Sequence, residues 1–481
     1  MFKNSCSICG ILCILWLFKN RDIMKYKKIE LMLILGLLGL NLFAMEDRSD
    51  HIVGYQWYEE PERVDLKKDF TLNECVENLK DIVYLLESSY IGFDEMEKRG
   101  FDKEAFIKNS DSLFSNEKNK SLFKLSDYIY NNLHPYINDC HFKIGCGDTY
   151  YNFGNKKVIF LSDTYVIKIK AGYKVIDSSQ IPIGTEISIS DENLFKTIHN
   201  GKEVFRLGVL ASKGERDYTK FLPVSVNDEN IRLKCIYIPK TFSSNVFTVV
   251  ETKNSVYINI PVFDTNAEHF ESFRKLGKKY CNKKNLIIDV RQNPGGGDPY
   301  FNEFLYDLYS GEENESIFTK FLKDRDSAYK KRWIKSPLNE HIFDFEKDSS
   351  YGITYLENSK KIENNKNKFK TKFKGNLIFL TSKSSSSCSE EIILFSKQLF
   401  DNVYTVGMNT SGSILYGNIL YYRLKNSGLF LIVAQKEWFY DNDLEEGTGI
   451  LPDYVVTGNF EETIRFLTKD KEISKKVLYL H

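Results

Sequence analysis

The sequence predicts an α/β protein in which a helical N-terminal part and a β-rich middle part precede an α/β core. Three observations predict this class. Apolar residues recur at spacings of three and four over residues 68–140, apolar and polar residues alternate in short runs over 142–262, and strands alternate with helices from about residue 265 onward. Apolar strands that alternate with helices are typical of a sheet covered by helices.

Each part of the chain has its own pattern. NECVENLKDIVYLLESSY and FKLSDYIYNNLHPYI are amphipathic, and Pro135 ends the second of these helical stretches. Short alternating runs such as YVIKIK and SVYINIPV predict the strands of the middle part. In the core we expect helices at 269–281, 299–310 and 389–400, buried strands at 285–290 and 376–381, and a hairpin at 418–435. Residues 311–375 are rich in Lys, Asn and Glu and interrupt this alternation, which predicts an inserted arm or lid.

The composition and the charge of the chain exclude two classes of protein. Of the 481 residues, 42% are hydrophobic and 14% are aromatic, which is enough for large buried cores and excludes a disordered protein. Lys and Arg together number 66, as do Asp and Glu, so the formal net charge is zero. A neutral chain gives no electrostatic reason for nucleic acid or an anionic membrane surface as a partner. We therefore expect no nucleic-acid partner.

The first 45 residues are predicted to be a signal peptide or a membrane anchor. Apolar runs occur at 6–18 and 31–43, and both are shorter than the roughly 20 residues of a transmembrane helix. The second run follows the basic stretch MKYKK and ends near Ala44, as in a signal peptide whose translation starts at Met24. An uncleaved anchor, with N-terminal membrane attachment, is the alternative. In both cases we expect the rest of the chain to be extracytoplasmic.

Three domains are predicted to follow, namely a helical domain over 46–141, a β-rich domain over 142–250, and an α/β domain over 251–481 that contains the insertion. Six cysteines lie in them without a CxxC pair or a cluster of histidines, so we expect no metal site. Cys140 and Cys146 are close enough in sequence to form a disulfide in an oxidising compartment, which the sequence leaves open.

The stretch LIIDVRQNPGGG (286–297) leads from a strand into three glycines. Successive glycines let backbone N–H groups approach a ligand closely. The turn could bind phosphate, although GxGxxG and the Walker lysine are absent. It could also form an oxyanion hole, or be only a tight structural turn.

The stretch SSSSCSEE (384–391) joins a predicted strand to a predicted helix. A serine there lies in the positive field of a helix N-terminus, which suits a nucleophile. However, serine is also a common N-cap, and glutamate is favoured in a first turn. His141 in NDCHFKIG and the glutamates in LEEGTGILPDY (444–454) are equally ambiguous when each stretch is taken alone.

Taken together, these stretches resemble the C-terminal processing (tail-specific) and tricorn-type serine peptidase family. Members show a DGH-like element and then DLRxNxGG, SxSxSE, GExTxG and ExxGIxPD. The corresponding stretches here are DCH (139–141), DVRQNPGG (289–296), SSSCSE (385–390), GMNTSG (407–412) and EGTGILPD (446–453). The resemblance covers about residues 70–480 and implies a crotonase/ClpP-like α/β catalytic core with an N-terminal helical cap. IPIGTEISISDENLFKTI (181–198) also resembles part of a PDZ domain, which implies that the β-rich module binds peptides by strand addition.

The resemblance also implies roles for individual residues. When the third motif is aligned on Glu390, its middle serine is Ser387, the implied nucleophile. The N–H of Cys388 and that of Gly295 or Gly296 would form the oxyanion hole.

The family uses two kinds of general base, and this sequence is similar to the branch that uses histidine. The Ser-Lys branch has a lysine just after the fourth motif, where this chain has Ser413. The tricorn-type branch uses a histidine and a glutamate, whose places are taken by His141 and Glu446, with Glu445 as the fallback for Glu446. Cys140 stands where relatives have glycine or a relaying serine, and a thiol is a weak donor.

What the resemblance implies is a serine-type peptidase that needs no cofactor and cleaves extracytoplasmic peptides or unfolded proteins. Ser387 would form the acyl-enzyme, with His141 as the base and Glu446 as the supporting acid. The competing class is a family member that binds peptides or other ligands without turnover. The missing lysine and the cysteine before the histidine motivate this alternative.

Overall fold

The computed structural model describes residues 46–481 apart from 57–68, 115–119, 148, 215–216, 227–228, 240–243, 265, 311–329, 337, 339–351, 357–371, 441–443 and 479–481. The chain divides into two units, Met1–Arg48 and Ser49–His481, and the elements below belong to the second. The signal peptide or anchor predicted over 1–45 lies outside the described residues. Within the described part, no helix is both long and apolar enough to cross a membrane.

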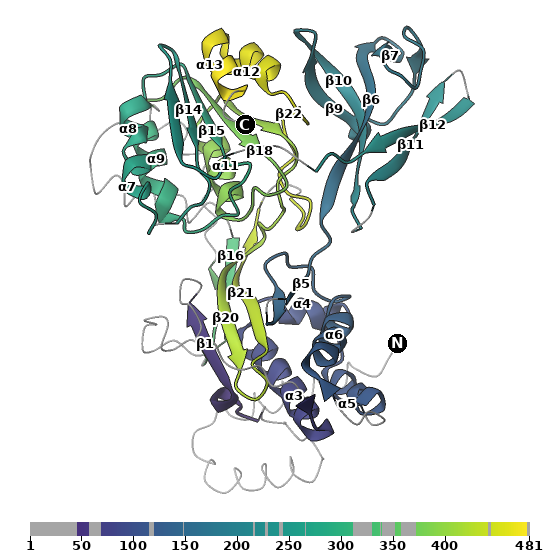
Figure 1. Ribbon diagram of the computed structural model, residues 1–481, viewed down its shortest axis with the longest axis vertical. Coiled ribbons are helices and arrows are strands. Elements are labelled where there is room, and N and C mark those ends of the chain that lie inside the picture. The colour runs from purple at the N-terminus through teal and green to yellow at the C-terminus, as the bar shows by residue number, and fades with distance from the viewer. Residues whose placement is uncertain are drawn as a thin grey trace, which may run out of the picture. The chain divides into compact units, whose positions relative to one another are not determined.

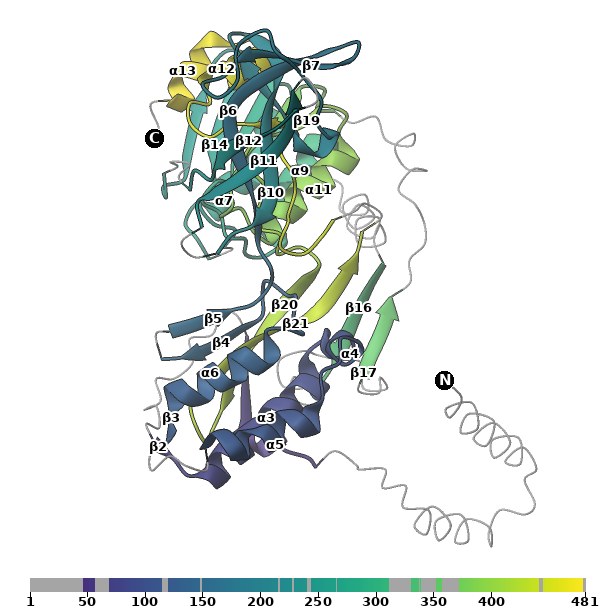
Figure 2. The same ribbon diagram turned by 90° about the vertical axis from the view of Figure 1, so that its right-hand side faces the viewer.

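The helices expected over 68–140 are confirmed, and they are α3 (Leu72–Ser89), α4 (Phe93–Lys98), α5 (Lys103–Phe114) and α6 (Leu122–Leu133). Thr71 caps α3 because the N–H of Glu74 donates to Thr71 Oγ1 (3.2 Å) and the N–H of Thr71 donates to Glu74 Oε2 (2.8 Å). The short strands β2 (Asp69–Phe70) and β3 (Lys120–Ser121) pair beside these helices. The apolar faces of the helices form one buried cluster with residues of the strands β20 (Tyr416–Leu424) and β21 (Phe430–Phe439). Figure 2 shows α3, α5 and α6 beside these strands.

The hairpin expected at 418–435 is confirmed as β20 (Tyr416–Leu424) and β21 (Phe430–Phe439). These two strands form the centre of an antiparallel sheet whose other strands come from distant parts of the sequence. Its other strands are β1 (Ile52–Gln56), β4 (Lys143–Cys146), β5 (Thr149–Asn152), β16 (Lys330–Lys335) and β17 (Gly352–Leu356). The described part of the predicted insertion therefore contributes two strands to this sheet. The sheet also crosses the predicted domain boundaries, which stay a prediction.

The β-rich middle part is confirmed as a seven-stranded sheet in the order β11-β12-β6-β10-β9, in which β7 also pairs with β6, and β8 pairs with β7 (Figure 1). The strands are β6 (Lys157–Ile169), β7 (Gly172–Asp177), β8 (Glu186–Ile187), β9 (Leu194–His199), β10 (Lys202–Ser212), β11 (Thr219–Val226) and β12 (Glu229–Ile236). The sheet encloses its own apolar cluster, centred on Phe160, Val175 and Leu207. Its likeness to a PDZ domain stays a prediction.

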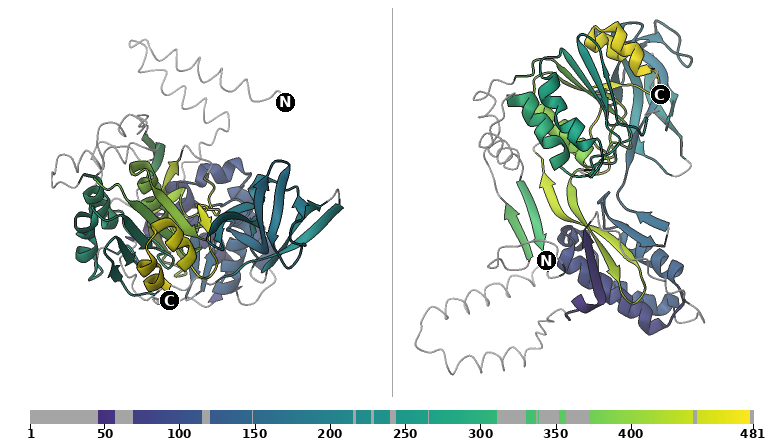
Figure 3. Two further views of the ribbon diagram at one scale, coloured as in Figure 1. Left: turned by 90° about the horizontal axis from the view of Figure 1, so that it is seen from above. Right: turned by 60° about the vertical axis from the view of Figure 1, so that its left-hand side comes forward.

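The α/β core contains a mostly parallel sheet in the order β13-β14-β15-β18-β19-β22. The strands are β13 (Thr248–Glu251), β14 (Ser255–Asn259), β15 (Asn285–Asp289), β18 (Asn376–Thr381), β19 (Val403–Gly407) and β22 (Tyr454–Val455), and the helices are α7 (Phe270–Arg274), α8 (Leu276–Tyr280), α9 (Pro299–Ser310), α11 (Cys388–Leu399), α12 (Glu461–Thr468) and α13 (Lys471–Leu478). Helices lie on both faces of this sheet (Figure 3).

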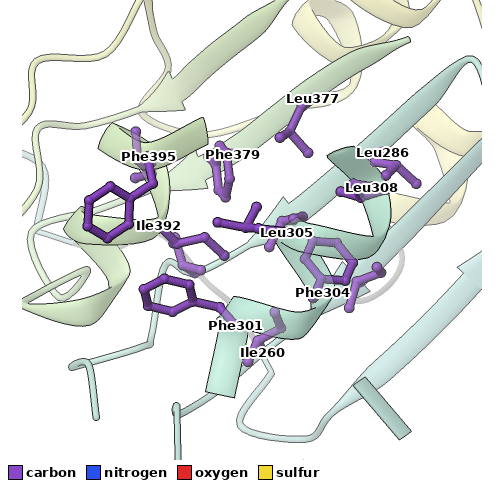
Figure 4. Packing of buried hydrophobic residues seen from close by; sticks show 14 of the residues in the cluster. Ile260, Leu286, Phe301, Phe304, Leu305, Leu308, Leu377, Phe379, Ile392 and Phe395 are labelled. Atoms are coloured by element: carbon purple, nitrogen blue, oxygen red, sulfur yellow. The ribbon is translucent and has the colours of Figure 1, made fainter. Parts of the chain in front are cut away.

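Alternate residues of the central strands supply the two faces. Leu286 and Ile288 pack with α9 and α11, whereas Ile287 between them packs with α12 and α13. Figure 4 shows the first of these layers, in which Phe301 and Phe304 of α9 and Ile392 and Phe395 of α11 surround Leu377 and Phe379 of β18. This three-layer packing fixes the ends of β15 and β18, from which the site is built.

One expected helix is wrong in detail. The stretch 269–281 forms two short helices, α7 and α8, which meet at Lys275. After this break the backbone of Gly277 lies against α9, where a Cβ atom would be 2.3 Å from the carbonyl oxygen of Phe304. A straight helix with a larger residue there would not pack as closely.

Candidate active site

Three of the four sequence stretches that were ambiguous singly line one cavity of about 860 Å³. The glycine turn contributes Gly295 and Gly296, the serine-rich stretch contributes Ser387 and Cys388, and the early motif contributes His141. Segments from the β15 end, the α11 start and the stretch before β4 therefore converge, although more than 240 residues separate His141 from Ser387 in sequence. The cavity is the candidate active site.

Ser387 has a backbone conformation that side chains rarely adopt. It is the N-cap of α11, with φ 54° and ψ −121°. Non-glycine residues in such sparsely populated regions carry strain, and strand-to-helix turns of this kind expose a nucleophilic serine in other enzymes. Ser387 is also half-buried at the cavity wall. Among the serines of SSSSCSEE it alone has a positive φ.

Two of the neighbouring serines are structural. Ser385 Oγ donates to the carbonyl oxygen of Val290 (2.7 Å), and Ser389 Oγ donates to that of Asn293 (2.9 Å). The N–H of Ser386 also donates to the Asn293 carbonyl oxygen (3.1 Å). These bonds tie the serine-rich turn to the glycine turn, so the position of Ser387 is set by the end of β15 as well as by α11.

The glycine turn leaves donors at the place where Ser387 begins α11. A Cβ atom on Gly295 would lie 2.8 Å from Ser387 Cβ and 3.2 Å from Cys388 N, so the two backbones touch there. The N–H of Gly295 donates to Asn293 Oδ1 (2.8 Å) and is already occupied. In the described part of the chain, no hydrogen bond from the N–H of Gly296 or of Cys388 is found. Of the two predicted glycine donors, the geometry therefore favours Gly296.

Glu390 has a larger role than the helix start predicted for it. Its carboxylate is fully buried and accepts from the N–H of Ser387 (3.0 Å), Gly412 (2.8 Å) and Ser413 (3.0 Å), and from Thr410 Oγ1 (2.5 Å). It thus connects the nucleophile candidate to the loop after β19. The SxSxSE pattern contains this residue, but nothing in the sequence indicates partners more than 20 positions away.

His141 lies beside Asp139, a residue whose role the sequence did not indicate. The His141 Nδ1 to Asp139 Oδ1 distance is 3.9 Å, and the N–H of His141 donates to the same oxygen (2.7 Å). His141 Nδ1 is buried and has no hydrogen-bond partner among the described residues. Burial raises the pKa of Asp139 to about 7. Its place in DCH was the only sequence signal for this carboxylate.

Glu446 is close to His141 but is engaged with backbone amides. Its Oε1 accepts from the N–H of Cys140 (2.9 Å), and its Oε2 accepts from the N–H groups of Ile414 (3.0 Å) and Leu415 (2.8 Å). Burial, and then the charge of Asp139, raise its pKa well above the usual range. Glu445, the fallback, is 57% exposed and pairs with Lys157 (2.6 Å). Of the two glutamates, only Glu446 reaches the histidine cluster.

Lys383 is a second residue that the sequence did not indicate. Its Nζ donates to three carbonyl oxygens, those of Thr410 (2.8 Å), Ser411 (3.0 Å) and Gly447 (3.0 Å). The lysine therefore joins the loop after β19 to the turn that carries Glu446. Burial lowers its pKa to about 8.

Electrostatics keep His141 neutral in the ligand-free protein. Burial, and then the charges of Lys143 and Lys156, lower the pKa of His141 to about 3. In the described part of the chain no hydrogen bond joins Ser387 Oγ to His141. Catalytic hydrogen bonds often tighten only when substrate binds, so the lack of this bond does not exclude the pair.

Two trios of side chains could hold a cation. Asp139, His141 and Glu446 place ligand atoms within 4.8 Å of one another, and so do Asp298, Cys388 and Glu391. Cys388 Sγ lies 2.7 Å from the carbonyl oxygen of Gly296, and burial raises the pKa of its thiol well above the usual range. The six described cysteines, Cys140 and Cys146 included, are free thiols.

A strained serine at a strand-to-helix turn, backbone donors beside it, and a histidine in the same cavity form the arrangement of an acyl-transferring serine hydrolase. Residues 254–456 match the model of peptidase family S41. The chain therefore carries a peptidase domain of the serine type, and a peptidase acts on peptides or proteins. The matched residues include Ser387 and Glu446, whereas His141 precedes them. A search of curated proteins finds no significant match.

Several solved structures are similar to the chain at low sequence identity. Mature CPAF is 14% identical, with 85% of this chain and 96% of that chain covered and a TM-score of 0.42. The photosystem II D1 C-terminal processing protease is 13% identical, with 83% and 98% covered and a TM-score of 0.32. The tricorn protease is 12% identical, with 85% and 37% covered and a TM-score of 0.34. At these TM-scores the likenesses carry no argument about mechanism.

Proposed function

We propose that the chain hydrolyses peptide bonds of extracytoplasmic peptides or unfolded proteins, with Ser387 as the nucleophile and His141 as the base. The observation that carries this proposal is the strained backbone of Ser387 at the start of α11, in the same cavity as His141. Strain of this kind is retained where the surrounding structure enforces it, often because a function requires it. No cofactor takes part in the proposed reaction.

In the proposed reaction Ser387 Oγ attacks the peptide carbonyl carbon while His141 takes the hydroxyl proton. The carbonyl oxygen becomes an oxyanion, which accepts from the N–H groups of Gly296 and Cys388. Loss of one such donor costs about 3–4 kcal/mol of transition-state stabilisation in a related site. His141 then gives its proton to the leaving amine, and water hydrolyses the acyl-enzyme by the same steps.

Two buried carboxylates share the supporting role that was assigned to Glu446. Asp139 Oδ1 lies 3.9 Å from His141 Nδ1. In the proposed reaction it approaches this nitrogen and orients the ring, which leaves the other ring nitrogen for Ser387. Glu446 holds the backbone of Cys140 and of the loop at Ile414, next to the same ring. Asp139 and Glu446 each place an oxygen within 4.8 Å of a His141 nitrogen. In their ionised form they favour the imidazolium that forms during the reaction.

A second candidate function is peptide binding without turnover. The observation that favours it is the low pKa of His141, about 3, together with the lack of a hydrogen bond to Ser387 in the described part of the chain. A neutral, weakly basic imidazole activates a serine poorly. A peptidase therefore needs the substrate to bring Ser387 and His141 together, whereas a protein that only binds peptides needs no such change.

Hydrolysis of an unfolded protein separates these functions. Reduced, alkylated α-lactalbumin is incubated with the wild type, Ser387→Ala and His141→Ala, and new N-termini are counted by mass spectrometry. We expect cleavage by the wild type, and rates at least about 1,000-fold lower for both variants. Ser386→Ala, in the same turn but without the strained backbone, is the matched control and should cleave. Equal cleavage by the wild type and Ser387→Ala would contradict the proposal, and binding without cleavage would favour the second candidate.

A further inference from the structure

The charged residues of the catalytic cavity fall into two groups. Asp298 and Glu391 lie beside Cys388, with ligand atoms within 4.8 Å of one another. Lys143 and Lys156 lie near His141, whose pKa their charges lower. The cavity therefore has a positive region on the side of the proposed base, supplied by the strand β4 and by the chain just before β6.

These two lysines differ from the other lysines near the site. Lys383 donates to three carbonyl oxygens, and Lys157 pairs with Glu445 at 2.6 Å. By contrast, no carboxylate within 4.0 Å and no side-chain hydrogen bond is found for Lys143 or Lys156 among the described residues. Lys143 is half-buried, where an ammonium without a counter-charge is unfavourable, and burial together with the charge of Lys156 lowers the pKa of Lys143. Lys156 is exposed. The pair lacks an anion.

We propose that Lys143 and Lys156 form a carboxylate-binding subsite beside His141, which selects peptides that carry an acidic side chain or a free C-terminal carboxylate near the scissile bond. The subsite rests on the proposed peptidase function, because the substrate must lie in the cavity with its carbonyl at Ser387. A carboxylate between the two ammonium groups accepts charge-assisted hydrogen bonds from both. It also offsets the repulsion between them.

The subsite couples substrate selection to the strength of the base. Two of the three causes that lower the pKa of His141 are the charges of Lys143 and Lys156. A bound carboxylate offsets part of this positive charge, so we expect His141 to become a stronger base when a matching substrate is present. The ionisable groups that face His141 from the surrounding elements are Asp139, Cys140, Lys143, Lys156 and Glu446, with Lys383 behind Cys140 and Glu446. Of these only the lysines oppose protonation of the ring.

Matched peptides test the subsite. Cleavage sites in α-lactalbumin first identify the position at which Asp or Glu is most enriched. Synthetic peptides with Glu or Gln at that position, each as a C-terminal acid and as an amide, then give kcat/KM values. We expect the wild type to have a kcat/KM about 10-fold or more higher for the peptide with the carboxylate, with changes in both kcat and KM. A difference between the Glu and Gln peptides indicates a side-chain carboxylate, and a difference between the acid and amide forms indicates the C-terminal carboxylate.

Substitutions then assign the preference to the lysines. In the double variant Lys143→Gln/Lys156→Gln, the ratio of kcat/KM for the acidic peptide to kcat/KM for the neutral peptide should fall towards one. Lys143→Arg keeps the positive charge and should retain most of the preference for the acidic peptide. Lys168→Gln, on the exposed part of β6, makes the same charge change away from the cavity and is the control. A preference that survives the double substitution, or a wild type without any preference, would overturn the subsite.

A binding assay keeps the subsite distinguishable from the peptidase proposal. Fluorescence anisotropy measures the same labelled peptides on Ser387→Ala, with and without the lysine substitutions. Lysine-dependent binding of the acidic peptide supports the subsite even if the wild type cleaves nothing, which would refute only the proposed hydrolysis. Equal binding of the Glu and Gln peptides and of the acid and amide forms overturns the subsite even if cleavage is observed.

Discussion

Replacing Ser387 by glycine is expected to make the protein more stable than replacing it by alanine, which reverses the usual order. Alanine keeps the Cβ atom in a backbone conformation of φ 54° and ψ −121°, where a Cβ atom is poorly tolerated. Glycine removes that strain, and both substitutions remove the hydroxyl. The comparison therefore isolates the backbone strain from the chemistry.

The size of the difference follows from two opposing contributions. A non-glycine residue in a sparsely populated region costs about 1–3 kcal/mol. Glycine gains flexibility in the unfolded chain and loses about 0.5–1 kcal/mol of stability for this reason. The net expectation is that Ser387→Gly exceeds Ser387→Ala in unfolding free energy by roughly 0.5–2 kcal/mol. With an m-value near 3 kcal/mol/M, the urea midpoints should differ by about 0.2–0.7 M.

Urea unfolding followed by tryptophan fluorescence measures this difference, and Ser386 provides the matched control. Ser386 lies in the same turn with an ordinary φ, so Ser386→Gly should be less stable than Ser386→Ala by about 0.5–1 kcal/mol. Opposite signs at the two neighbouring positions are the expected result. If alanine is as stable as glycine at position 387, the strain argument is refuted, and with it the main structural reason for choosing this serine.

Three further predictions concern the surroundings of Ser387. Gly296→Ala should lower the unfolding free energy by about 3 kcal/mol or more, measured by urea unfolding, because φ is 140° and the added Cβ atom would lie 1.9 Å from the Phe263 carbonyl oxygen. Glu390→Gln should lower the unfolding free energy by about 2–4 kcal/mol in the same assay. Both carboxylate oxygens accept hydrogen bonds, so the NH₂ group of glutamine would face an N–H or O–H donor in either position. Asp139→Asn should flatten the pH dependence of stability between about pH 4 and pH 7. The pKa of Asp139 is raised to about 7 in the folded protein, so folding favours its protonated form and stability is lost as the pH rises through this window.

Each of these predictions has a contrary outcome. Wild-type stability of Gly296→Ala would mean that the glycine turn has room for a Cβ atom beside the Phe263 carbonyl oxygen. Unchanged stability of Glu390→Gln would mean that the hydrogen bonds of this carboxylate do not stabilise the surroundings of Ser387. An unchanged slope of stability against pH in Asp139→Asn would mean that folding does not raise the pKa of Asp139.

Local patterns predicted the elements of the core, because each depends on residues within one strand or helix. The strand 376–381 and the helix 299–310 have the bounds that were expected. The break between α7 and α8 was missed, as was the close approach of Gly277 to the Phe304 carbonyl of α9, because the local pattern of 269–281 carries no information about α9. The two C-terminal helices were not predicted, although their apolar residues complete one face of the sheet.

The candidate site was predictable to the extent that its motifs are local. Their order pointed to Ser387, His141 and Glu446, and the first two line one cavity. The sequence could not indicate that the oxygens of Glu446 are engaged by three backbone amides while Asp139 faces the ring, because those amides come from two loops that meet only in the folded chain. Lys383 was missed for the same reason.

Covalent labelling by a fluorophosphonate tests whether Ser387 is an activated nucleophile, since such probes react with activated serines and require no knowledge of the substrate. The folded wild type is incubated with the probe, and the modified peptide is identified by mass spectrometry. We expect one adduct per chain, located on Ser387, absent in Ser387→Ala and in unfolded protein, and formed more slowly in His141→Ala. An adduct on another serine, or a folded wild type that is not labelled, would contradict this expectation.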